Sequence, residues 1–95
     1  MVKLIFEFYG DRLKDKNLTE DEMLAEVREF AGENDIDETS HGIFEKDGED
    51  ALCLLMMIAH RLLTERPNYM ECLKSLVLDD DGDIEECVEI AKKWI

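Results

Sequence analysis

Residues 51–63 read ALCLLMMIAHRLL, and they decide the fold because the first nine, residues 51–59, are all apolar. Acidic residues precede this run, while Arg61 and Arg66 lie toward its end, which is the charge order that a helix dipole favours. The stretch therefore predicts a helix over residues 48–65. Because a helix that is apolar on every side must be covered on every side, we expect this helix to be buried at the centre of the fold.

The segments on either side of the central run also show helical signals. Thr19 and Glu22 have the spacing of a capping box, which predicts a helix over residues 20–31. Pro67 ends the central helix, and a fourth helix is expected after it. A last helix is expected over residues 84–95. The apolar face of the fourth helix would hold Tyr69, Cys72, Leu73, Leu76 and Val77.

Residues 2–9, VKLIFEFY, fit two structures equally well. Their apolar residues follow helical spacing and also the alternation of a strand. A lone strand needs a partner, and the segment 42–45 is the only candidate. We therefore expect a first helix ending near Asn17, with a strand at 2–9 as the alternative. The expected fold is all-α: one domain, residues 1–95, forming a compact bundle of about five short helices around the helix at 48–65.

Charge is the strongest compositional feature, because the 95 residues carry a net charge of −14. Such a chain is repelled by nucleic acid and by anionic membranes, so direct binding to either is not expected. The expected partner is another protein, in particular a basic one, and a homodimer also fits the sequence. The three cysteines show no CxxC spacing and no secretion signal precedes them, which together predict a cytoplasmic protein.

Two acidic segments are not explained by the preference of carboxylates for first helical turns. One lies in the polar loop 33–47, and the other lies in the run 79–83. The leading hypothesis is a non-enzymatic protein-interaction module that uses the loop, for example an acidic regulator or inhibitor of a basic, nucleic-acid-binding protein. The candidate binding residues in the loop are Glu33, Asp35, Asp37 and Glu38.

The alternative hypothesis is a small cation- or ligand-responsive domain that uses Asp79, Asp81 and Asp83. These aspartates match the first ligand positions of an EF-hand loop. Position 6 of such a loop would be Ile84 and position 12 would be Ile90, whereas the motif needs glycine and glutamate there. An acidic turn between two helices is therefore the favoured interpretation of this run.

Catalysis and cofactor binding are not expected. Cys53 and His60 suggest a catalytic pair, and with Cys72 and Cys87 they suggest a metal site, but no spacing supports either. All three cysteines stand where a helix already needs an apolar residue. Trp94 is either the last core residue of the bundle or part of a dimer contact. The methionines Met56, Met57 and Met70 are interpreted as core fillers in preference to an adaptable groove for a partner helix.

Overall fold

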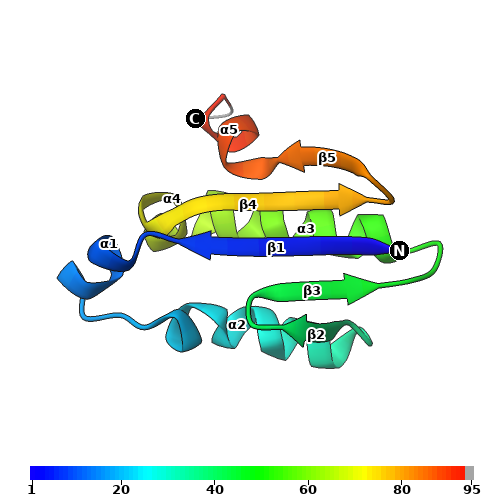
Figure 1. Cartoon of the computed structure of the whole chain (residues 1–95), viewed down its shortest axis with the longest axis horizontal. Helices are drawn as coiled ribbons and strands as arrows, with labels where there is room; N and C mark the ends of the chain where they lie inside the picture. The colour runs from blue at the N-terminus through cyan, green and yellow to red at the C-terminus, as the bar shows by residue number, and fades with distance from the viewer. Residues whose placement is uncertain (94–95) are drawn as a thin grey trace.

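The computed structural model describes residues 1–93 and shows an α/β fold, in which helices pack on a five-stranded antiparallel sheet (Figure 1). The all-α bundle expected from the sequence is therefore wrong. The strands are β1 (Val2–Phe8), β2 (Asp37–Ser40), β3 (Ile43–Lys46), β4 (Leu73–Asp80) and β5 (Asp83–Glu86). The helices are α1 (Gly10–Asp15), α2 (Glu20–Glu33), α3 (Ala51–Glu65), α4 (Pro67–Cys72) and α5 (Cys87–Lys92).

Strand β1 lies at the centre of the sheet, whose order is β2-β3-β1-β4-β5. It pairs with β3 on one side and with β4 on the other, both antiparallel. Val2, Leu4 and Phe6 are buried on one face, as strand alternation requires. The helix favoured for residues 2–9 is thus wrong and the strand alternative is confirmed, because the strand has a second partner, β4, besides the candidate segment 42–45. The expected first helix is reduced to the short α1.

The acidic run at 79–83 forms a β-hairpin and not a turn between helices. Asp80 faces Asp83 across the two-residue loop Asp81-Gly82. Both loop residues have positive φ, 54° and 95°, as in the type I′ turns whose twist suits a hairpin. The fourth helix predicted from the sequence consequently ends at Cys72, and the predicted last helix shortens to α5. Trp94 lies outside the described residues.

Residues 33–47 also form a hairpin, β2–β3, where the sequence suggested an irregular loop. Its turn needs Gly42, which has φ of 76° and whose backbone oxygen accepts a hydrogen bond from Phe6 N at 2.8 Å. A Cβ atom at this position would stand 3.2 Å from the Phe6 oxygen. Close approach of two backbones thus selects glycine here.

Helix α2 begins where the sequence predicted. The amide of Glu22 donates to the Thr19 hydroxyl at 3.1 Å, and that hydroxyl donates to the Glu22 carboxylate at 3.2 Å. Helices α2 and α3 lie on one face of the sheet, with α3 behind β1 and β4 and α2 along the β2 side (Figure 1). A single buried cluster forms between the two layers, with Leu4, Leu55 and Leu76 among its members.

Helix α3 is central but is not covered on all sides. Ala51, Leu55, Ile58 and Leu62 face the sheet and are buried. In contrast, Cys53, Met56 and Met57 on the other side of the helix are exposed. The expectation of complete burial is therefore wrong, because two helices and a sheet enclose only one side of this apolar segment.

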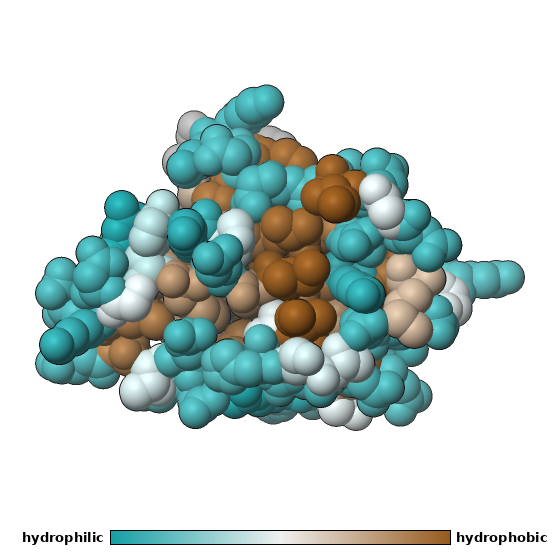
Figure 2. All heavy atoms as spheres, in the orientation of Figure 1, coloured by the Kyte–Doolittle hydropathy of each residue, from teal (hydrophilic) through white to brown (hydrophobic). Residues whose placement is uncertain are grey.

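Within residues 1–93, no helix covers the opposite face of the sheet, which faces the viewer in Figure 2. The register places Ile43, Ile5 and Val77 in one cross-strand row on that face. Figure 2 shows apolar side chains over the middle strands, surrounded by hydrophilic ones. The ion pairs Lys3–Glu45 and Lys74–Glu7 border this row, at 3.9 and 3.5 Å.

Across residues 1–93, none of the helices combines the length and apolar character needed to span a bilayer.

The two sides of α3 predict opposite outcomes for neighbouring substitutions. We expect Leu55→Asp to destabilise the fold by about 4 kcal/mol or more, because it buries an unpaired carboxylate. Met56→Asp should change the free energy of unfolding by less than about 1 kcal/mol, because its side chain is already 47% exposed. Urea titration followed by circular dichroism measures both. Equal destabilisation by the two variants would contradict the described orientation of α3.

Candidate functional site

A groove of about 630 Å³ lies between the uncovered side of α3 and the β5–α5 segment. It is the larger of the two hollows described for residues 1–93. Helix α3 supplies one wall, from Leu52, Cys53, Met56, Met57, Ala59, His60 and Leu63. The other wall and the ends come from Glu49, Leu78, Glu85, Cys87 and Ile90. The groove is thus mainly apolar, with carboxylates at Glu49 and Glu85.

The α3 wall is a continuous stripe along the helix. Its exposed residues are Cys53, Met56, Met57 and His60, whose positions i, i+3, i+4 and i+7 place them on one side of the helix, while Ala59 and Leu63 beside them are buried. This exposed stripe extends over eight residues, or about 10 Å at 1.5 Å of rise per residue. Spacing of this kind normally forms the seam between two packed helices.

The groove exists because the inner face of β5 is not covered along its length. Phe44, Leu4 and Leu78 form a buried row across β3, β1 and β4, and Glu85 on β5 is the next member of that row. Residues opposite one another in antiparallel strands point to the same face, so Glu85 points toward the helical layer. An inward-pointing charge on an edge strand also opposes uncontrolled pairing of that edge.

Thiol chemistry in the groove is suppressed at Cys87. Burial, together with the smaller effect of the nearby Glu86 and Glu85 carboxylates, raises the pKa of the Cys87 thiol to about 11. A thiol with this pKa is protonated at neutral pH and is a poor nucleophile. Cys53 and His60 line the same groove, whereas Cys72 is buried in the core and its pKa is also raised by burial.

The structure brings together only some of the residues that suggest a metal site, because Cys53, Cys87 and His60 line the groove while Cys72 is buried in the core. Within residues 1–93, no group of three or more histidine, cysteine, aspartate or glutamate side chains is placed to hold a metal ion. All three cysteines are free thiols. The geometry of the groove suits contact with an apolar surface.

No family model, curated protein or solved structure matches the chain. The site has to be interpreted from its own geometry.

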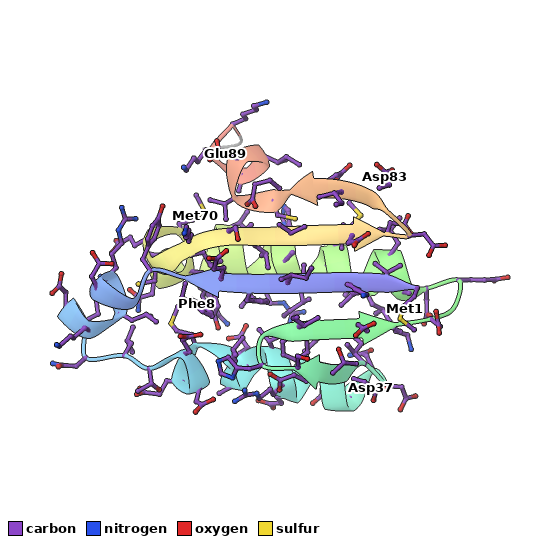
Figure 3. The ribbon with its side chains drawn as sticks, viewed as in Figure 1. Met1, Phe8, Asp37, Met70, Asp83 and Glu89 are labelled. Carbon is purple, nitrogen blue, oxygen red and sulfur yellow. The ribbon has the colours of Figure 1, made fainter. Side chains whose placement is uncertain are left out.

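The loop residues predicted as a binding site lie at the opposite edge of the sheet, on the β2 side. Figure 3 shows Asp37 at this edge and Glu89 on the α5 side of the molecule. Glu33, Asp35 and Asp37 are exposed, whereas Glu38 is half-buried and hydrogen-bonded to neighbouring elements. Its carboxylate accepts hydrogen bonds from Arg28 at 2.7 and 3.1 Å and from Gly42 N at 3.0 Å. Glu38 thus joins β2 to α2 and supports the hairpin turn.

The aspartates of the cation hypothesis serve the β4–β5 hairpin. Asp79 accepts a hydrogen bond from Gly82 N at 2.8 Å, which holds the turn. Asp81 pairs with the N-terminal ammonium group of Met1 at 3.2 Å, and that contact raises the pKa of the ammonium group. Asp83 begins β5, on the far side of the turn (Figure 3). The cation response stays a prediction.

Sequence reasoning missed the groove as a site. Glu49, Leu52, Glu85 and Ile90 were assigned no functional role, and Met56 and Met57 were interpreted as core fillers. One signal was available, because an apolar helix with adjacent methionines fits a partner groove as well as a core. Choosing between them required the position of the sheet, which local patterns did not give.

A pH-dependent effect follows from the contacts of Glu38. Hydrogen bonds from Arg28, and then from Gly42, hold the pKa of Glu38 below its ordinary value of 4.5. Because the folded pKa is lower than the unfolded one, this stabilisation is present above the ordinary value and is lost as the pH falls through the folded value. We expect Glu38→Gln to lower the thermal midpoint by a few degrees at pH 7 and by much less at pH 3. Scanning calorimetry at the two pH values measures the difference.

Asp37→Asn is the matched control, since Asp37 is the exposed neighbour of Glu38 on the same strand. It should leave the midpoint nearly unchanged at both pH values. A Glu38→Gln variant as stable as the parent protein at pH 7 would show that this carboxylate has no structural role.

Proposed function

We propose that this protein is a non-enzymatic interaction module that binds a segment of another protein in the groove beside α3. The observation that supports this most is the incomplete covering of α3. Residues 51–59 are apolar without interruption, yet Met56 and Met57 are 47% and 48% exposed. Leaving such a helix half uncovered costs free energy in the isolated protein, and a partner would recover that free energy.

The exposed methionines differ from ordinary exposed apolar residues. Within residues 1–93, the clearly exposed large apolar side chains are Met1, Met56, Met57 and Ile84. Met56 and Met57 are adjacent and line a hollow, whereas Ile84 projects from the other face of the edge strand. Covering the exposed half of each methionine would contribute about 1 kcal/mol, and the flexible thioether side chain adapts well to a partner surface.

The groove replaces residues 33–38 as the proposed binding surface. Of those loop residues, Glu38 is engaged by Arg28 and by the β2–β3 turn. The groove, in contrast, has exposed apolar side chains, Met56 and Met57, that are not packed in the protein's own core. The free thiols and the net charge of −14 support a cytoplasmic protein whose partner is itself a protein and not a nucleic acid or a membrane.

A site-specific photo-crosslinker tests this proposal. A benzoylphenylalanine residue replaces Met57 in the groove, or Ile84 on the opposite face as the matched position, and each protein is irradiated in extract of its own cells. We expect the Met57 position to give a discrete heterologous adduct that is lost when Leu52 and Met56 are both changed to Gln. The Ile84 position should not give that adduct.

Two results would contradict the groove as the binding surface. One is the same adduct from both positions, which would indicate general adhesion. The other is an adduct from Met57 that contains only a second copy of this chain, which would make the groove a homodimer contact.

A further inference from the structure

We infer that the segment taken up by the groove is an amphipathic helix with a basic flank, a conclusion that rests on the proposed function and specifies its partner. Three features support it: the spacing of the apolar stripe, the room left in the helical layer, and the charge at the groove.

The stripe on α3 is built to contact a helix. Cys53, Met56, Met57 and His60 are exposed along the groove at positions i, i+3, i+4 and i+7, over about 10 Å, which is the length of about two helical turns. A second helix that packs alongside α3 would find this stripe as its seam. An extended segment would instead pair through backbone hydrogen bonds with the free edge of β5, and it would not need a stripe on α3.

The helical layer is too narrow for the sheet beneath it. Five strands at about 4.8 Å each make a sheet roughly 24 Å wide, whereas two adjacent helices cover roughly 20 Å. Helix α3 lies over β1 and β4 and α2 lies on the β2 side, so the uncovered part is the inner face of β5. Helix α5 spans six residues, about 9 Å, and covers only part of that length. A third helix beside α3 would complete the layer.

Charge selects the kind of helix. Glu49 and Glu85 are exposed carboxylates at the groove, and none of the lining residues, all within the described part of the chain, is lysine or arginine. Glu86 lies on the other face of β5, opposite Val77, and Glu89 pairs with Lys92 at 3.3 Å, so the acidic groups at the groove are Glu49 and Glu85. Lysine or arginine on the flanks of a bound helix would meet these carboxylates, while acidic flanks would be repelled. The fit is to a basic amphipathic helix.

Synthetic peptides test the partner class directly. The probe is a labelled peptide of about 16 residues, built from leucine and lysine with its leucines three and four positions apart. The comparison peptides are a leucine–glutamate version with the same spacing and a scrambled leucine–lysine version without an apolar face. Affinities are measured by fluorescence anisotropy, with circular dichroism of the mixtures. We expect the patterned leucine–lysine peptide to bind at least about tenfold more tightly than either comparison peptide, and to gain helix on binding.

Charge-matched variants separate the groove from the general acidity of the protein. Glu49→Gln with Glu85→Gln removes two charges at the groove, and Glu33→Gln with Asp37→Asn removes two at the opposite edge. The first pair should weaken binding about three- to tenfold, and the second pair should weaken it less than twofold. Met56→Gln with Met57→Gln should weaken binding about tenfold, while Ile84→Gln should leave it unchanged.

The outcomes also separate this inference from the proposed function. Equal weakening by the two charge pairs, equal binding of the scrambled peptide, or a bound peptide without helix would overturn the basic amphipathic helix as the ligand. If the Met57 crosslink nevertheless forms, the groove still binds protein and only the partner class is wrong. Absence of both peptide binding and the crosslink would overturn both proposals.

Discussion

The rest of the structure depends on the two-sided pairing of β1. This strand is hydrogen-bonded to β3 and to β4, and its inner residues, such as Leu4, form the floor on which α3 packs. Because β1 joins segments from the beginning, middle and end of the chain, its pairing places both hairpins and fixes the layer of helices on one face. An apolar helix and an alternating strand then bury each other, and residues of α2 and β4 extend the same core.

The same arrangement leaves α3 with two different environments. Its sheet-facing side is buried, and its other side forms one wall of a groove whose opposite wall is an edge strand and a short helix. Because the helices cover only part of the sheet, an apolar strip on α3 stays exposed beside the edge strand β5. The strip is concave, contains adjacent methionines and is bordered by carboxylates, so it combines the features of a protein-binding surface with a preference for basic partners.

Local signals predicted some of these elements and not others. The capping box at Thr19 and the apolar run of α3 are complete within one segment, so the sequence located both helices. The strands could not be predicted, for a physical reason. The alternation of residues 2–9 also fits a helix, and the stability of a strand comes from partners that are distant in the chain. The Asp81-Gly82 pair is a signal for a β-hairpin, but it is also compatible with the turn between helices that the sequence led us to expect. Because of that expectation, β4, β5 and the second wall of the groove were not predicted. Glu85 fits the first turn of a helix equally well until its row in the sheet is known.

The three cysteines offer the most direct test of the central claim, that one side of α3 is buried by the fold while the other is open. Cys53 lies on the open side, Cys72 is buried and Cys87 is half-buried. The measurement is the rate at which each thiol of the native protein reacts with a maleimide, read by mass spectrometry of its peptides. The account predicts fast labelling of Cys53 and labelling of Cys72 only after unfolding. Equal protection of Cys53 and Cys72 in the native protein would contradict it, because α3 would then be covered on both sides.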